Sequence, residues 1–344
     1  MEQGPPQHEI ADYYIHIDDG QFDPKGDYPS LENRTRDLIN KAVEDMSGGN
    51  GKAPGHLLLY AHGGLNTVKG SAARVGKWTP VFEANNIRHI HFIWETGLLA
   101  SLKDVLFGKD QFSKDRAGGF SDWTDTILES VTQPVGYPLW KEMTGDAELA
   151  FQKATAAGTR TLLFLKKALD QKSNVERPII HLAGHSAGSI WIGHLLNRWY
   201  QMGGFPIETL QLFAPACTMD FYKSNISKHL KKSAVKLMVH YHLDKDRELD
   251  DNVAAIYRKS LLYLVSRSYE SKSGTVPIMG MEKYWNNQSH PRITTYNTRD
   301  HSDITDSNSH GGFDNDKATM NHLLKIILGN KPAHEFEKTD LEDY

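Results

Sequence analysis

The junction between residues 178 and 201 constrains the fold of this chain more than any other segment. An apolar run, Pro178–Ala183, leads directly into Gly184-His185-Ser186-Ala187-Gly188, and apolar residues at helical spacing follow. Small residues on both sides of Ser186 are typical of a very sharp turn between a buried strand and a helix. The pentapeptide also occurs by chance, so its place between strand and helix carries the argument. The turn predicts a serine in a strained backbone conformation at the carboxyl end of a strand.

Short apolar runs alternate with longer segments of helical spacing along most of the chain. This alternation is typical of α/β folds, in which a mostly parallel, twisted sheet has helices on both faces. Strands are expected at residues 12–17, 56–61, 88–94, 178–183, 209–214, 235–242 and 292–297. Helices are expected at residues 31–46, 147–171, 187–201, 252–266 and 316–328.

The stretch from residue 97 to residue 145 does not fit this alternation. It is too long for an unstructured loop in a compact domain and is rich in apolar and aromatic side chains. We therefore expect residues 97–145 to form a helical cap, or lid, inserted into an α/β core of residues 11–96 and 146–330. A simple surface insertion is the alternative. Residues 1–10 and the acidic tail 334–344 are expected to be loosely ordered.

Composition excludes several classes of function. The chain has 43 acidic and 39 basic residues with the two signs mixed, so we expect no basic surface for nucleic acid. It has one cysteine, Cys217, and therefore no intramolecular disulfide, which fits a reducing compartment. No signal peptide is visible and no apolar run reaches the ~20 residues that span a bilayer. A cytoplasmic protein without a transmembrane segment is expected, and the sequence does not define its oligomeric state.

Ser186 is the candidate nucleophile. A serine on such a turn lies at the carboxyl edge of the sheet, beside the positive end of a helix, where negative charge on a reaction intermediate is favoured. Its hydroxyl needs a base to take the proton and a third group to orient that base. For this type of turn, the acid is expected next along the chain and the histidine after it.

His310 is the best-placed candidate for the base. It lies in the Ser-His-Gly-Gly-Phe sequence at residues 309–313, after the last expected strand and before the last expected helix. A glycine-rich loop there lets the imidazole reach back over the strand ends. His301 also follows the last strand and is the second choice, whereas His290 precedes that strand and His322 lies inside the helix.

The acid is expected just after the strand at residues 235–242. Asp246 is the first choice and Asp244 the second. Asp250 and Asp251 follow shortly after. The alternative for all four carboxylates is a solvated acidic turn that caps the helix near residue 252, and most of them are expected to have that role.

Gly64 and Ala187 are the candidates for an oxyanion hole. The loop His62-Gly63-Gly64-Leu65-Asn66 ends an early strand, where a backbone donor to the oxyanion belongs. The N–H of Gly64, with that of Ala187 directly after the nucleophile, would complete the hole. The alternative is a glycine turn without a role in chemistry.

Together these residues resemble the α/β-hydrolase superfamily over roughly residues 55–330. Within it, the chain is similar to a poorly characterised group of bacterial hydrolases. That group has a His-Gly entrance loop ending in Asn, a Trp that closes the next strand and a Gly-His-Ser turn. An Ala-Pro follows the next strand, and an Asp-x-x-Leu follows the acid strand. The matching residues here are His62-Gly63-Gly64-Leu65-Asn66, Trp94, Gly184-His185-Ser186, Ala214-Pro215 and Asp246-Arg247-Glu248-Leu249.

The match at Asp246 is the main reason for preferring it to Asp244. The resemblance implies an α/β-hydrolase fold, with two departures. The superfamily usually opens with an antiparallel strand pair, whereas residues 12–61 predict a strand, a helix and a strand. The insertion at residues 97–145 is also larger than the pattern of the group.

The residues and the resemblance predict a serine hydrolase for carboxylic esters or related acyl substrates, working through a Ser-His-Asp triad and an acyl-enzyme intermediate. No cofactor is implied, and no metal is expected because two pairs of strand histidines lack a third ligand at a diagnostic spacing. The expected partner is a small-molecule or lipid-like acyl substrate, and the aromatic-rich segment 97–145 suggests an apolar acyl group or contact with a membrane surface. An acyltransferase or thioesterase would use the same residues. A non-catalytic binding or signalling module is the alternative outside the enzymes.

Overall fold

A computed structural model describes residues 4–49, 51–94, 125–251, 257, 259–285 and 288–342. The described residues form an α/β fold around an eight-stranded sheet in the order β2-β1-β4-β3-β5-β6-β7-β8. Neighbouring strands are parallel, except that β2 is antiparallel to β1 at the edge. The strands are β1 (Tyr14–Asp18), β2 (Gln21–Phe22), β3 (His56–Ala61), β4 (Ile87–Trp94), β5 (Ile179–His185), β6 (Ile207–Phe213), β7 (Val235–His242) and β8 (Ile293–Asn297).

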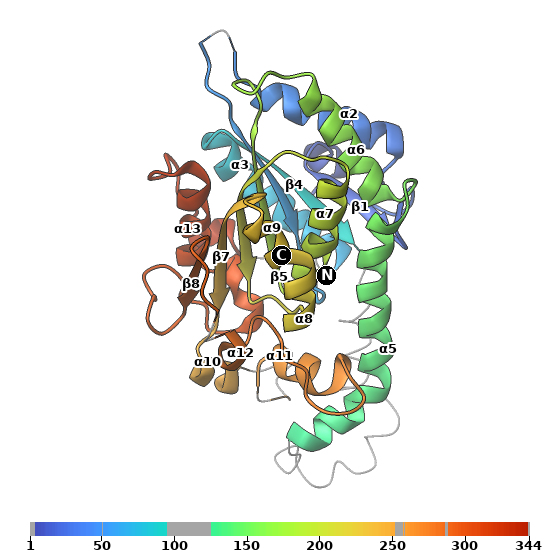
Figure 1. Cartoon of the computed structure of the whole chain (residues 1–344), viewed down its shortest axis with the longest axis vertical. Coiled ribbons are helices and arrows are strands. Elements are labelled where there is room, and N and C mark those ends of the chain that lie inside the picture. Colours follow the sequence, from blue (N-terminus) through green and yellow to red (C-terminus); the bar gives the residue numbers. More distant parts are fainter. Residues whose placement is uncertain are drawn as a thin grey trace.

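Helices cover both faces of the sheet because successive strand side chains point into two different apolar layers. In β3, Leu57 and Leu59 belong to one layer, with apolar residues of α2 (Glu32–Met46), α5 (Asp125–Gln152), α6 (Ala157–Asp170) and α7 (Gly188–Gln201). Leu58 and Tyr60 belong to the other, with residues of α3 (Val68–Ala84) and α13 (Lys317–Leu328). In Figure 1, α5 and α6 lie along one side of the sheet and α13 along the other.

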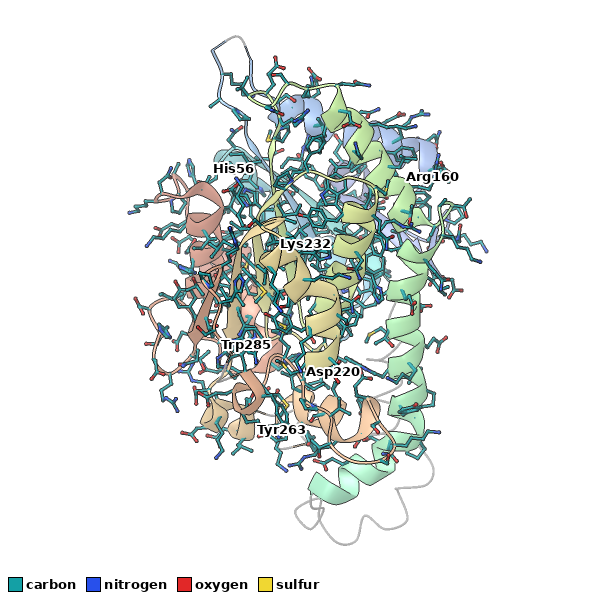
Figure 2. The ribbon with its side chains drawn as sticks, in the orientation of Figure 1. His56, Arg160, Asp220, Lys232, Tyr263 and Trp285 are labelled. Atoms are coloured by element: carbon teal, nitrogen blue, oxygen red, sulfur yellow. The ribbon has the colours of Figure 1, made fainter. Side chains whose placement is uncertain are left out.

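The parallel strands end together at one end of the molecule. His56, the first residue of β3, lies near the opposite end, whereas Tyr263 of α11 (Leu261–Leu264) lies near the end where the strands finish (Figure 2). The short helices α8 (Met219–Tyr222), α10 (Lys245–Asp250) and α12 (Glu282–Trp285) lie at this same end (Figure 1). The loops after β5, β6 and β7 therefore meet there, as parallel topology requires.

The expected strands are present, with β3 and β7 at the predicted residues. Besides several short helices, one long helix and one short strand were not expected. Helix α3 was not predicted, because Gly70, Gly76 and Pro80 weaken its helical pattern. The two-residue strand β2 forms a hairpin with β1, so the chain does open with an antiparallel pair, but a very short one.

The helical segments near the expected cap differ from the prediction. The predicted helix at 147–171 is instead the end of α5 and, after a break, α6. Of the expected cap, residues 97–124 lie outside the described residues. Residues 125–145 belong to α5, which continues without a break through the predicted boundary, and its Trp140 and Met143 are buried in the same apolar layer as β3. In the predicted helix at 252–266, residues 252–256 and 258 lie outside the described residues, and α11 is followed by the π-helix η3 (Val265–Tyr269).

The described residues at both ends pack against the body of the protein, contrary to the expectation of loose ends at 1–10 and 334–344. Ile10 is buried beside β1. Phe336 and Leu341 are buried in the layer of α3 and α13, where the Phe336 ring meets the ring of Phe82 edge-on at 5.4 Å between centroids. Apolar side chains therefore anchor segments that look polar overall. Among the described residues, no helix is long and apolar enough to cross a membrane.

Candidate active site

Ser186 lies on the sharp turn between β5 and α7. The strand ends at His185 and the helix begins at Gly188. Ser186 has a φ of 52°, in the left-handed region that residues with a Cβ rarely adopt. A conformation of this kind costs about 1–3 kcal/mol and persists only where the surroundings enforce it.

Hydrogen bonds from two directions hold the strained serine. The N–H of Ser186 donates to the carbonyl oxygen of Phe213 in β6 at 2.9 Å. The Ser186 carbonyl oxygen accepts from the N–H groups of Ser189 and Ala216, each at 3.0 Å, and from Ser189 Oγ at 2.7 Å. The turn is thus fixed both to the neighbouring strand and to the first turn of α7.

Two glycines allow other parts of the chain to approach the turn closely. A Cβ at Gly188 would lie 2.2 Å from the carbonyl oxygen of Ala61 at the end of β3, closer than real Cβ contacts come. A Cβ at Gly63 would lie 3.2 Å from the Cβ of Ser186. The small residues around the serine therefore permit contact with β3 and place the loop that follows β3 beside the nucleophile.

His310 meets Ser186 at the strand ends. It begins the 3₁₀ helix η4 (His310–Asn315), and its Nε2 lies 2.8 Å from Ser186 Oγ. For the hydroxyl to donate to Nε2, the ring proton must be on Nδ1. Both residues are 4% exposed, so a proton transfer between them would take place out of contact with bulk water. The distance is that of a nucleophile and its base.

The backbone of His310 is anchored on both sides. Its N–H donates to Asp251 Oδ2 at 2.8 Å, and its carbonyl oxygen accepts from Nε2 of His185 at 2.8 Å. Burial and, to a lesser extent, the neighbouring His185 lower the pKa of His310 to about 3, although Asp314 opposes the decrease. His310 is therefore neutral at neutral pH, which is the form a general base requires.

The other histidines considered for the base are engaged elsewhere. Nδ1 of His301 faces the backbone N–H of Asn297, the last residue of β8, and Nδ1 of His290 accepts from a backbone N–H two residues later. His322, in α13, is hydrogen-bonded to the hydroxyl of Tyr241 at 2.7 Å. Of the four, His310 is the one that the structure brings to Ser186.

The structure does not bring Asp246 or Asp244 to His310. Asp246 is exposed on α10. Asp244 is buried, but its carboxylate caps α10 by accepting from the N–H groups of Asp246 and Arg247 at 3.1 and 3.2 Å, and also from Thr298 Oγ1 at 2.8 Å. Although burial alone would raise the pKa of Asp244, these hydrogen bonds lower it. The preference for Asp246 is therefore corrected, because the helix turns its side chain into solvent and uses Asp244 as a cap.

Asp251 is the carboxylate from this segment that reaches His310. It directly follows α10, is 7% exposed, and accepts the N–H of His310 through Oδ2. Nδ1 of His310 is buried and has no hydrogen-bond partner in the part of the chain that the structure describes. From the sequence, Asp251 was one of several carboxylates of which most were expected to lie in a solvated capping turn. The short helix α10, which begins at residue 245 and brings Asp251 next to the His310 loop, was not predicted.

The two expected oxyanion residues are neighbours. A Cβ at Gly64 would lie 3.5 Å from the Cβ of Ala187. The N–H of Ala187 makes no backbone hydrogen bond within the described residues, and it lies at the positive end of α7. The arrangement places a backbone donor beside Ser186, where a developing oxyanion would lie.

The entrance-loop residues that carry the family resemblance are hydrogen-bonded to one another. The carbonyl oxygen of Gly63 accepts from Asn66 Nδ2 at 3.1 Å and lies 2.8 Å from His62 Nδ1. The backbone N–H of Trp94 donates to His62 Nε2 at 3.2 Å. Burial lowers the pKa of His62 to about 3, in keeping with a neutral ring that donates through Nδ1 and accepts through Nε2.

A buried ion pair lies next to the site. Arg74 of α3 and Asp314 of η4 are 3.4 Å apart at NH2 and Oδ2, with side chains 5% and 0% exposed. The same oxygen accepts from the Tyr60 hydroxyl at 2.6 Å and lies 3.2 Å from Nδ1 of His185. Burial alone would raise the pKa of Asp314, but Arg74, His185 and these hydrogen bonds hold it far below its usual range. This ion pair could not be predicted from the sequence, because α3 itself was not expected.

The paired histidines of β4 and β7 are buried in the core. His89 Nε2 lies 3.0 Å from Thr79 Oγ1, and the ring of His240 lies 4.2 Å from that of Trp285. Among the described residues, no group of three or more His, Cys, Asp or Glu side chains is arranged to hold a metal ion.

Comparison with known proteins gives little further information. No family model matches the chain, and no curated protein matches it. A solved structure of an uncharacterized protein from Pseudomonas aeruginosa is similar over 92% of this chain and 50% of that one, with 12% identity and a TM-score of 0.31. The chain thus spans about half the length of that protein, and a likeness this weak carries no argument about function.

Proposed function

We propose that the chain is a serine hydrolase of the α/β-hydrolase fold that cleaves carboxylic esters or related acyl compounds. One observation carries the proposal: Ser186, on a turn with positive φ, has its Oγ 2.8 Å from Nε2 of His310. The mostly parallel sheet supports it, as does the order of Ser186 after β5, Asp251 after β7 and His310 after β8.

In the proposed reaction, Ser186 Oγ attacks the acyl carbon while Nε2 of His310 takes the hydroxyl proton. The N–H groups of Ala187 and Gly64 stabilise the oxyanion of the tetrahedral intermediate. The intermediate collapses to an acyl-enzyme when His310 returns the proton to the departing alcohol. Water, deprotonated by His310, then attacks the acyl carbon, and the acid is released as Ser186 regains its proton.

Asp251 takes the place of Asp246 as the proposed acid. Its carboxylate already contacts the backbone of His310, and Nδ1 of that ring needs an acceptor when Nε2 takes the serine proton. Asp314 also lies nearby, but its Oδ2 is shared by Tyr60, Arg74 and His185. Asp314 raises the pKa of the His310 ring, but we propose Asp251 as the acid because its carboxylate contacts the His310 segment directly.

Ester hydrolysis by purified protein tests this function. We expect wild type to hydrolyse p-nitrophenyl esters of short or medium acyl chains, and His310→Ala to lose about 10³-fold or more in kcat. His301→Ala is the matched control, because His301 lies in the same part of the chain but away from Ser186, and it should retain near wild-type activity. A folded wild type without esterase activity, or equal losses in the two variants, would count against the proposal and favour a binding module. Thioester substrates and added alcohol acceptors distinguish a thioesterase or acyltransferase from an esterase.

A further inference from the structure

Three buried side chains, those of Arg74, Asp314 and His185, connect the loop after β3 with the segment that carries His310. On one side, NH2 of Arg74 lies 3.3 Å from Asn66 Oδ1 and 3.4 Å from Asp314 Oδ2. On the other side, His185 bridges Asp314 and the carbonyl oxygen of His310, at 3.2 and 2.8 Å from its two ring nitrogens. The connection therefore runs from α3, through η4, to the last residue of β5.

Each end of this connection contacts a part of the proposed catalytic site. Asn66 donates to the carbonyl oxygen of Gly63, the residue directly before the oxyanion candidate Gly64. His185 fixes the backbone of His310, whose ring contacts the nucleophile. A displacement of Asp314 would thus move both the oxyanion loop and the base.

Stability alone is a poor explanation for these residues. Arg74, Asp314 and His185 are 4%, 0% and 4% exposed. A buried charge pair loses hydration on folding, and apolar residues of similar volume often give equal or greater stability. Buried polar networks whose members are mutually bonded instead fix a single geometry, which is what an active site requires.

We propose that Arg74, Asp314 and His185 are positioning residues that hold the oxyanion loop and His310 in one fixed relative arrangement. The inference rests on the proposed hydrolase function. None of the three touches the reacting atoms: Arg74 acts through Asn66, and His185 acts through the His310 backbone.

Variants of the three residues should lower kcat more than they raise KM. We expect Arg74→Met and Asp314→Asn to lower kcat by about 100-fold, since small displacements of catalytic groups have effects of that size. His185→Gln retains a donor toward the His310 carbonyl and should lose less. Arg74→Lys keeps the charge and should recover part of the activity lost in Arg74→Met. The double variant Arg74→Met/Asp314→Asn should lose much less than the product of the two single losses, because the residues act as one unit.

Arg88→Met is the matched control. Arg88 is also a buried arginine in an ion pair, with Asp45, but its partner lies on α2 and the pair does not contact the site. Circular dichroism and thermal unfolding select variants that are folded at the assay temperature. Folded Arg74 and Asp314 variants that are no slower than Arg88→Met would overturn the inference. The proposed hydrolase function would still stand in that case, provided that wild type hydrolyses esters.

A second measurement does not depend on turnover. Among the described residues, the charged or titratable groups that contact or influence His310 are Asp251 from the segment after α10, His185 from β5 and Asp314 from η4. His185 lowers the pKa of His310, so His185→Gln should move the NMR titration of the His310 ring to higher pH, whereas Arg88→Met should leave it unchanged. An unchanged titration in His185→Gln would contradict the inference. If wild type has no esterase activity, the proposed function fails, but a shift of the His310 titration between wild type and His185→Gln would still support the inference.

Discussion

The turn that carries Ser186 and the acidic segment after β7 differ in how far neighbouring residues determine their structure. On the nucleophile side, five consecutive residues, 184–188, define the turn, and its strain, its glycines and its position follow from local sequence. On the acid side, Asp244, Asp246 and Asp251 lie within eight residues of one another, and their roles differ completely. One caps a helix, one faces solvent and one holds His310. A strained turn can be recognised from its local sequence, whereas the hydrogen-bond partner of a carboxylate depends on the path of the chain in the folded protein.

The largest expected effect is on the nucleophile side. Ser186→Ala should lower kcat for ester hydrolysis by about 10⁶-fold, because the attacking oxygen is lost. Ser189→Ala is the control for a buried serine in the same turn. It removes the hydrogen bond that the Ser189 hydroxyl donates to the Ser186 carbonyl and the one that it accepts from the N–H of Cys217, and it should cost about tenfold or less in kcat. Steady-state kinetics of the two variants measure the difference. Comparable losses of kcat in Ser186→Ala and Ser189→Ala would mean that the activity depends on the structure of the turn rather than on the Ser186 hydroxyl.

The acid side is tested by replacing each carboxylate in turn. Asp251→Asn should lower kcat by about 10²- to 10⁴-fold, because it weakens the group that we propose to stabilise the His310 imidazolium. Asp246→Asn should remain within about twofold of wild type, since its side chain is exposed on α10. Asp244→Asn should mainly lower the melting temperature by weakening a helix cap. A large loss in Asp246→Asn together with normal kinetics in Asp251→Asn would restore the assignment made from the sequence.

The glycines on the two sides should also differ. Gly188→Ala should destabilise the fold by about 3 kcal/mol, because the new Cβ would clash with the backbone of β3. Gly311→Ala, in the His310 loop, has open space around the Cβ position and should change stability by about 0.5 kcal/mol or less. Chemical denaturation of both variants measures this contrast. Similar unfolding free energies would show that the turn is less tightly packed than described.

The smallest expected effects are on pH dependence. Burial lowers the pKa of His310 to about 3, compared with about 6.5 for an exposed histidine. A base that stays neutral in weak acid gives a kcat/KM that is nearly constant from pH 8 to pH 5 and falls only below that range. An inflection near pH 6.5 that His310→Ala or the ring titration assigns to His310 would contradict its burial.

Stability should fall over the same acid range. Burial also lowers the pKa values of His62, His89 and His181 to about 3. Their folded-state pKa values lie below the unfolded value of about 6.5, so the unfolded chain binds protons first as the pH decreases. The stabilisation present above pH 6.5 is therefore lost progressively toward pH 3, and the melting temperature should decrease by several degrees between pH 7 and pH 4. A melting temperature that rises in this range would show that these rings are accessible to solvent.

The sequence predicted features that depend on neighbouring residues and missed those that depend on distant ones. The strands at 56–61 and 235–242, the turn at Ser186 and the glycine-rich loop of His310 each have a local pattern, and the structure places Ser186 and His310 in contact. Helix α3 has no clear pattern because glycine and proline interrupt it, so the role of Arg74 could not be predicted. Asp251 and Asp314 contact the site through residues 59 or more positions away, and no local pattern reveals such contacts.

The most direct test of the account is labelling with a fluorophosphonate probe, followed by peptide mass spectrometry. The account predicts a covalent adduct on Ser186 in wild type, no adduct in Ser186→Ala, and labelling about 10³-fold slower in His310→Ala, with Asp251→Asn also strongly slowed. Ser189→Ala and Asp246→Asn should label at nearly the wild-type rate. An adduct on a different serine, or a folded wild type that does not react, would contradict the claim that Ser186 and His310 form a working nucleophile and base.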